Sequence, residues 1–221
     1  MEPIWLSIKL AMITTIFLLF VGIPVAYWLS RKQSIVKVII EAFITMPLVL
    51  PPSVLGFYLL LAFSPNNAFG IWLHRHFDLQ LVFSFKGLVI ASIIYSLPFM
   101  VSPIKAAFSH LPRSMSEASY VMGKSKIETF FYILLPNIKP SIFTAAVLTF
   151  AHTLGEFGVV LMIGGNIPGE TKVASIAIYD AVETMDYGLA NSYALILFAI
   201  TFIIVIGVFV VNRNAVKSPF E

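Results

Sequence analysis

The stretch LPRSMSEASYVMGKSKIETFFYILLPNIKP, residues 111–140, is a polar segment between long apolar ones, and the rest of the chain is organised around it. Ser114 and Glu117 have the S-x-x-E spacing of a capping box, in which each side chain pairs with a backbone N–H group at the start of a helix. Gly123 can adopt the left-handed conformation that ends a helix. The spacing therefore predicts a helix that runs to Met122 and ends at Gly123.

The second half of this segment predicts another helix. Ser125 and Glu128 repeat the capping spacing. Pro136 is expected to end this helix, because proline has no backbone N–H to donate. Apolar residues recur at i, i+3, i+4 and i+7 and predict one apolar face: Ile127, Phe130, Phe131 and Leu134. Taken alone, the two helices are equally consistent with an amphipathic loop that lies on a membrane.

The composition is that of a membrane protein. The chain has 221 residues, of which 59% are hydrophobic and 11% are charged, whereas globular domains have about 45–50% apolar and about 25% charged residues. These values predict an all-α membrane protein with one transmembrane domain over residues 1–221. Cysteine is absent, which excludes disulfides and thiolate metal sites. The net charge of +3 is too small to indicate nucleic-acid binding.

The apolar segments are long enough to cross a bilayer about five times. A helix needs about 20 apolar residues to span the hydrocarbon core. Five stretches meet this length: 8–29, 36–63, 87–108, 141–163 and 189–211. We interpret the first as a peripheral helix, because its threonines and glycine allow close packing against a partner but indicate no chemistry.

Basic residues are unevenly distributed between the two sides of these segments. Ten of the fourteen fall on one side: Arg31, Lys32, Lys37, Lys105, Arg113, Lys124, Lys126, Lys139, Arg213 and Lys217. The other four fall on the opposite side: Lys9, Arg75, Lys86 and Lys172. Cytoplasmic loops carry the excess of Lys and Arg. The distribution predicts that the N-terminus lies outside and that the C-terminus and the 111–140 segment lie in the cytoplasm.

The second apolar stretch contains prolines where a plain spanning helix would not. Backbone breaks at membrane depth are tolerated where protein or a water-filled cavity satisfies the freed carbonyl groups. A kinked packing helix would explain the prolines, and so would a discontinuous helix that lines a translocation pathway. On the second interpretation, the candidate gate residues are Thr45, Met46, Pro47, Leu48, Pro51 and Pro52.

The fourth stretch contains two ionisable residues, His152 and Glu156. Their spacing of four places them on one face of a continuous helix. They are expected to tie helices together by hydrogen bonds, while a proton relay or a membrane-embedded enzyme remains an alternative. His152 and Glu156, with the adjacent Phe157, are also candidate pathway or gate residues. No nucleophile or metal-ligand set with suitable spacing accompanies the pair, so no catalytic residue, cofactor or metal site is predicted.

Two further patterns are weak. His74, Arg75, His76 and Asp78 in the 64–85 loop are better explained as a solvated polar loop than as a metal site. Gly123-Lys124-Ser125 looks like the end of a phosphate-binding loop. That motif needs a glycine at position 118, where Ala118 stands, so no nucleotide site is predicted.

The 111–140 segment resembles the EAA loop of ABC importer membrane subunits. The matching residues are Glu117, Ala118, Gly123, Ile133, Leu135 and Pro136. Ser119 departs from the pattern, because the family usually has a second alanine there. The resemblance implies a type I permease core with a cytoplasmic coupling helix, at about 111–140, that docks on a separate ATPase subunit. It also implies that ATP hydrolysis occurs on the partner and not on this chain.

Two other strings resemble the molybdate branch of these permeases: MPLVLPPSVLGFYLL at 46–60 and LGEFGVVLMIGGNIPGETKVASIAIYDAVE at 154–183. The resemblance implies a homodimer in a bacterial inner membrane, in contact with lipid. Two cytoplasmic ATP-binding subunits and a periplasmic or extracellular oxyanion-binding protein are the implied partners. Tungstate and sulfate or thiosulfate are alternative substrates.

Overall fold

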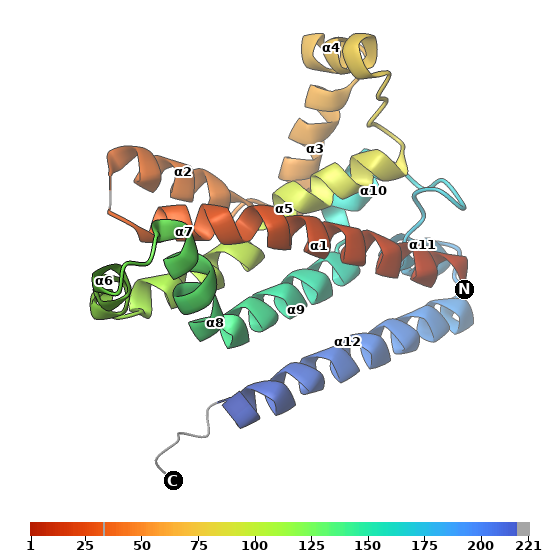
Figure 1. Cartoon of the computed structure of the whole chain (residues 1–221). Helices are drawn as coiled ribbons and strands as arrows, with labels where there is room; N and C mark the ends of the chain where they lie inside the picture. The colour runs from red at the N-terminus through yellow and green to blue at the C-terminus, as the bar shows by residue number, and fades with distance from the viewer. Residues whose placement is uncertain (33, 216–221) are drawn as a thin grey trace.

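The computed structural model describes residues 1–32 and 34–215, apart from the side chains of 209 and 211–215. Within the described residues, every regular element is a helix. Lys217 lies outside the described residues, as does the side chain of Arg213. Four long helices run side by side in Figure 1: α1 (Glu2–Ser30), α5 (Phe85–His110), α9 (Lys139–Gly155) and α12 (Tyr187–Ala215).

Helices α1, α5 and α9 pack against one another and form the core. Within the most apolar 18-residue window of each helix, 44% of α1 and 50% of α5 is buried, but only 6% of α12. The interpretation of the first segment as a peripheral helix is therefore wrong. Thr14 and Ala11 of α1 are completely buried, since small side chains let the neighbouring helices approach closely. The peripheral helix is α12.

The second predicted span is broken, as its prolines indicate. Helix α2 (Ile35–Thr45) passes into a 3₁₀ turn, η1 (Met46–Leu48), and α3 (Pro52–Phe63) then leaves at 111° to the preceding segment. Pro52 occupies the first position of α3, where a missing N–H costs nothing. Helix α4 (Ala68–Phe77) follows in the predicted outer loop.

The fourth predicted span, 141–163, is not one helix. Helix α9 ends at Gly155, and α10 (Gly158–Gly164) begins after an extended Glu156. Helix α10 packs against α3 and α5, and α11 (Ala174–Glu183) follows next to α12. Among the described residues, three helices are long and apolar enough to cross a membrane alone, or up to five if each bent helix pair counts as one span.

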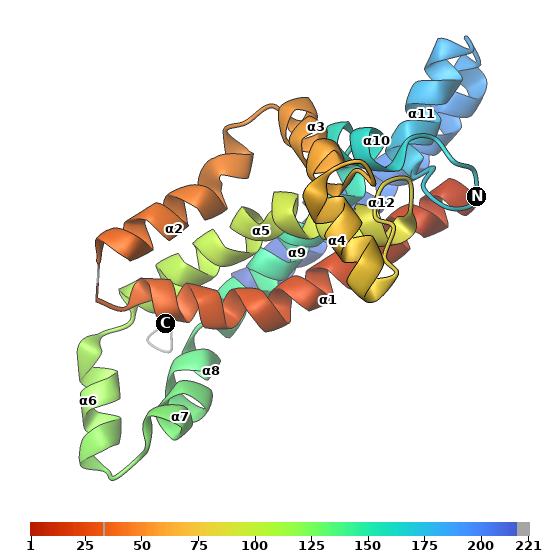
Figure 2. The same cartoon turned by 90° about the horizontal axis from the view of Figure 1, so that it is seen from above.

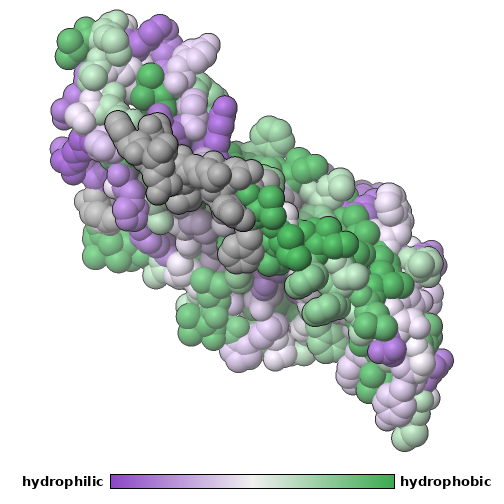
Figure 3. All heavy atoms as spheres, turned by 90° about the horizontal axis from the view of Figure 1, so that it is seen from below, coloured by the Kyte–Doolittle hydropathy of each residue, from purple (hydrophilic) through white to green (hydrophobic). Residues whose placement is uncertain are grey.

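The two ends of the bundle differ in what they carry. Figures 1 and 2 place the short helices α6 (Arg113–Val121), α7 (Lys126–Glu128) and α8 (Leu135–Asn137) at one end, and the N-terminus with α11 at the other. Figure 3 shows hydrophobic residues along the middle of one face and hydrophilic residues mainly toward its two ends. This is the pattern of a protein whose middle lies in hydrocarbon.

Candidate functional site: the coupling segment and the helix breaks

The first arm of the 111–140 segment is α6, and a left-handed glycine ends it. Gly123 has φ +79°. Its N–H bonds to the Tyr120 carbonyl at 2.9 Å, and the Lys124 N–H bonds to the Ser119 carbonyl at 3.1 Å. These two bonds define a Schellman motif, which satisfies the last carbonyls of a helix. The predicted helix end at Gly123 is confirmed.

The predicted capping box at the start of this helix is wrong. Helix α6 begins at Arg113, its N-cap position is Pro112, and no side chain caps it. Ser114 therefore lies within the first turn instead of before it, and its hydroxyl is in the wrong place to accept from the third helical N–H. Pro112 has an extended backbone, because its ring restricts φ. The helix therefore begins directly after Pro112, at Arg113, and not after Ser114.

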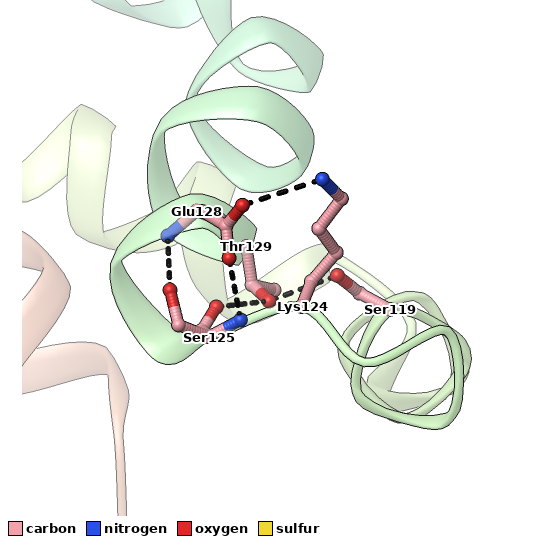
Figure 4. Close-up of polar contacts among 5 residues, drawn as sticks. All are labelled: Ser119, Lys124, Ser125, Glu128 and Thr129. Atoms are coloured by element: carbon pink, nitrogen blue, oxygen red, sulfur yellow. Dashed lines mark hydrogen bonds and ion pairs between the residues drawn. The ribbon is translucent and has the colours of Figure 1, made fainter.

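The second capping box is confirmed. The Glu128 N–H donates to Ser125 Oγ at 3.2 Å, and the Ser125 N–H donates to Glu128 Oε2 at 2.9 Å. Lys124 Nζ lies 3.3 Å from Glu128 Oε1, so one carboxylate serves both contacts, as Figure 4 shows. The backbone hydrogen bond from Ser125 is the main reason that the pKa of Glu128 is lowered, with smaller contributions from the Ser125 hydroxyl and Lys124.

A buried hydrogen bond joins the two arms. Ser119 Oγ and Thr129 Oγ1 are 2.8 Å apart, and both residues are completely buried. Because Thr129 Oγ1 donates to the Ser125 carbonyl, the Ser119 hydroxyl must be the donor to Thr129. Figure 4 shows this chain of contacts from α6 to the second arm. Ser119, the one departure from the EAA pattern, therefore adds an interaction that alanine cannot make.

The second arm is a continuous helical run with a wide turn in its middle. Residues 129–134 form a π-helix, η2, in which the Leu135 N–H bonds to the carbonyl of Phe130, five residues back. The prediction that Pro136 ends this helix is wrong, because α8 runs through Pro136 to Asn137. A π turn leaves room for the proline ring that an α turn lacks. The chain bends at Ile138 instead, by 71°, and α9 starts there.

Two residues of the predicted apolar face of this arm are packed in the core, and the other two are exposed. Phe130 and Leu134 pack into the core, where Phe130 makes an edge contact with Tyr27 at 4.7 Å between ring centroids. Ile127 is 71% exposed and Phe131 is 56% exposed. The four residues of the predicted apolar face therefore do not share one environment, because Ile127 and Phe131 are exposed. The wide turn rotates successive side chains by less than 100°, so the i, i+3, i+4 spacing no longer marks a single face.

The outer surface of the coupling segment carries large apolar residues at the polar end of the molecule. Val121 is 88% exposed and Tyr132 is 74% exposed. Glu117 and Ala118 are exposed next to them, while Ile133, Leu135 and Pro136 are half-buried. Exposed apolar residues that are rimmed by polar ones mark a surface for a protein partner.

The breaks in the second and fourth spans meet each other. A Cβ atom on Gly158, at the start of α10, would lie 2.7 Å from Pro52 Cβ, at the start of α3. The backbones are equally close one turn further on, since a Cβ on Gly56 would lie 2.8 Å from Met162 Cβ. Phe157 and Pro52 therefore belong to one junction of two interrupted helices.

Of the other candidate gate residues, Met46, Pro47 and Leu48 form the η1 turn, which packs against α5. Thr45 is the last residue of α2, and Pro51 is the N-cap of α3. Pro47 is buried there, and Met46 and Leu48 are about half exposed. The Thr45 hydroxyl donates back to the Glu41 carbonyl at 2.9 Å, so its polar group is used within α2.

His152 and Glu156 do not stack on one helical face, and this expectation is wrong. Helix α9 ends at Gly155, so Glu156 is extended and turns toward α5, where Ser92 Oγ donates to its Oε2 at 3.0 Å. The His152 ring instead stacks on Phe99, with 3.9 Å between ring centroids. The expected hydrogen bond between helices is therefore present for Glu156. It is not found for His152, whose buried Nε2 has no hydrogen-bond partner among the described residues and whose ring contacts α5 by stacking.

We expect His152→Gln and Glu156→Gln to keep most transport activity. A glutamine at 156 can still accept from Ser92, and a glutamine at 152 keeps a flat group against Phe99. Uptake in cells, normalised to the amount of protein in the membrane, measures this. The control is Glu156→Leu, which leaves the buried Ser92 hydroxyl without its acceptor and costs about 1–3 kcal/mol. Loss of uptake in both glutamine variants at normal abundance would contradict a structural role.

Comparisons with known proteins agree with this arrangement. The family described as "binding-protein-dependent transport system inner membrane component" matches residues 11–217. The chain is 46% identical over 192 residues to the molybdenum transport system permease protein ModB of Azotobacter vinelandii, which covers 86% of this chain and 84% of that protein. It is 29% identical over 210 residues to the sulfate transport system permease protein CysT of Escherichia coli K12, covering 95% and 74%.

Among solved structures, a bacterial ABC transporter involved in the import of the polysaccharide alginate has a chain with the same fold. Its TM-score is 0.79 at 17% identity, covering 98% of this chain and 79% of that one. The fold is therefore that of type I ABC importer permeases, as predicted.

Proposed function

The chain belongs to the family of binding-protein-dependent transport system inner membrane components, and on that premise we propose that it forms the membrane pathway for molybdate. It is the permease subunit of an ABC importer and a multi-pass protein of the inner membrane. The family consists of transport permeases and not of enzymes, so the alternative of a membrane-embedded enzyme built on His152 and Glu156 has no support from it.

The energy source is ATP hydrolysis on two separate cytoplasmic subunits that dock on the coupling segment. The observation that carries this proposal is the exposed surface of α6 and the second arm, where Val121, Ile127 and Tyr132 point away from the bundle. Glu117 lies exposed beside them and offers a charged contact. A group of exposed apolar residues that is rimmed by polar ones is typical of a surface that a partner covers.

A second copy of this chain and an external oxyanion-binding protein complete the proposed assembly. The apolar side chains of α3 support the homodimer, because Phe57, Tyr58 and Leu61 are about half exposed along one helix. In a dimer, these helices and their breaks would face a shared pathway between the two copies. The binding protein would deliver the anion at the end that carries the N-terminus.

The pathway is proposed to close by apolar side chains and not by a ring of cations. Three lysines lie within the predicted spans, and the side chain of each already contacts another group of the chain. Lys105 pairs with Glu41, Lys37 donates to the Trp28 carbonyl, and Lys9 lies 4.8 Å from the centre of the Phe85 ring. A fixed cationic ring would hold a dianion and slow its release, whereas hydrophobic closure excludes water until the gate opens.

Molybdate is favoured over sulfate by the higher identity to the molybdenum permease, 46% against 29%. Uptake of labelled molybdate and labelled sulfate in cells that lack their own transporters for both anions tests this. We expect molybdate uptake that depends on co-expressed ATPase and binding protein, with little sulfate uptake. Sulfate uptake equal to or greater than molybdate uptake would contradict the proposal. Uptake of labelled tungstate in the same assay tests whether tungstate, the remaining alternative, is the transported anion.

The position of the pathway predicts where aqueous thiol reagents react. Because the chain has no cysteine, single cysteines can be introduced without background. Thr45→Cys and Phe157→Cys should react in a nucleotide-dependent way. Ile203→Cys should not react, although Ile203 is 69% exposed, because lipid covers α12. Labelling only at position 203 would place the pathway on other helices.

A further inference from the structure

A cavity of about 630 Å³ lies at the coupling end, between the end of α1, the start of α2 and helix α6. Figures 1 and 2 show α6 at the same end of the bundle as the end of α1 and the start of α2. Four cations line the cavity, with one carboxylate, that of Glu117: Arg31, Lys32, Lys37 and Arg113. We propose that this cavity binds the phosphate headgroup of an anionic membrane lipid.

The arrangement of the cations suits a phosphate. Arg31 lies over the Tyr27 ring, 4.7 Å from its centroid, and its guanidinium group donates to the hydroxyls of Tyr27 and Tyr120. A guanidinium group has five N–H donors, so most of them remain for a ligand while the group itself is held in place. Lys37 is likewise held, by the Trp28 carbonyl, and keeps two donors. Several cations that converge on a concave site without enough carboxylates to neutralise them attract an anion.

The surroundings of the cavity favour a lipid over a free oxyanion. Tyr27 and Trp28 belong to the aromatic residues that settle at the level of lipid headgroups. Next to the cavity, α2 presents apolar side chains to its surroundings: Ile35 is 73% exposed and Val36 is 57% exposed. Acyl chains can cover these side chains while the phosphate occupies the basic cavity, whereas a soluble anion leaves them uncovered. Basic pockets between helices on the cytoplasmic side bind lipid headgroups in this way.

A bound headgroup would connect the coupling helix to the bundle. Arg113 is the first residue of α6, and Arg31 follows the last residue of α1. One phosphate that contacts both residues reduces the freedom of α6 relative to α1. The lipid therefore acts as a structural cofactor of the end that receives the ATPase.

The test is a titration of the full-length permease, purified in detergent with its ATPase subunits. Dioctanoyl phosphatidylglycerol is the anionic probe and dioctanoyl phosphatidylcholine the neutral match, and native mass spectrometry counts the bound lipids. We expect the anionic lipid to bind preferentially. Lys32→Gln and Arg113→Gln should each weaken its binding roughly fivefold, since one basic residue near the membrane contributes about that factor. Arg75→Gln and Lys86→Gln, outside the cavity, are matched controls.

Lys32 is exposed and makes no described polar contact, so Lys32→Gln keeps the fold and decides the result even if Arg113→Gln does not fold. Equal binding of the two lipids, or equal weakening by the control variants, would overturn the proposal. A third outcome would also overturn the proposal: no preference between the two lipids, together with binding of inorganic phosphate or molybdate that Lys32→Gln weakens. The cavity would then bind a free anion and not a lipid headgroup. The binding assay does not measure transport, so a negative result leaves the proposed function standing.

Discussion

Replacing Gly123 by valine is expected to reduce the proposed uptake of molybdate by roughly five- to thirtyfold while the protein stays in the membrane. Gly123 has φ +79°, and the left-handed conformation costs a residue with a Cβ about 1–2 kcal/mol, more when the side chain is β-branched. Nothing lies within 4 Å of the position that a Cβ would take. The effect is therefore conformational, because valine disfavours the Schellman motif that turns α6 into the second arm.

Two variants control this result. Gly207→Val adds the same side chain in open space on α12, where no positive φ is required, and should leave uptake unchanged. Gly123→Asn should keep most activity, because asparagine tolerates the left-handed region. Co-purification of the ATPase, measured with uptake, should fall in Gly123→Val. Normal uptake and normal ATPase binding by Gly123→Val would contradict the coupling role of this turn.

Adding a single methyl group at Gly158 is expected to disrupt the junction of the broken helices. The new Cβ would lie 2.7 Å from Pro52 Cβ and 3.4 Å from Pro52 C and Ser53 N. Pro52 is a rigid ring in the first turn of α3, so the clash is relieved only if α3 and α10 move apart. Such overpacking costs about 1–3 kcal/mol. We expect Gly158→Ala to lower the midpoint of thermal unfolding by roughly 2–12 °C and to reduce uptake severalfold.

Gly155→Ala is the matched control, three residues earlier in the same chain segment. Nothing lies within 4 Å of its added Cβ, so both the unfolding midpoint and uptake should stay near the unchanged protein. If Gly158→Ala behaves like Gly155→Ala, the contact between the two breaks is not important for stability or for transport.

Local chemistry explains which parts of the site could be predicted from sequence. Gly123 and the Ser125–Glu128 capping box depend on residues within one turn, and both are confirmed. The box at Ser114 failed because Pro112 also specifies a helix start, and two adjacent signals compete for one turn. The prediction that the helix ends at Pro136 failed because a π turn, which has no distinct sequence signal, accommodates the proline.

Contacts between distant segments could not be predicted. The Ser92–Glu156 hydrogen bond joins residues 64 positions apart, and the spacing of His152 and Glu156 predicts a shared face only if the helix continues between them. The prolines within the second span predicted either a kink or a break there, and the structure has a break. The fourth breaks after Gly155, where one glycine and an extended acidic residue give a much weaker signal. The buried position of α1 was missed because apolar helices in lipid and in a protein core have the same composition.

Helices α5 and α9 flank the coupling segment and are hydrogen-bonded to each other, so a tilt at the coupling end would move their opposite ends. Helices α5 and α9 enter and leave that segment, and Ser96–Thr153 and Ser92–Glu156 contacts of 2.9 and 3.0 Å fasten them to each other near their far ends. Helix α9 has 17 residues, which corresponds to a length of about 25 Å. A tilt of about 5° at the coupling end therefore displaces the other end by about 2 Å, close to the radius of a water molecule. A small rotation at the coupling end would therefore move the chain next to the junction of α3 and α10, where Gly158 already lies against Pro52.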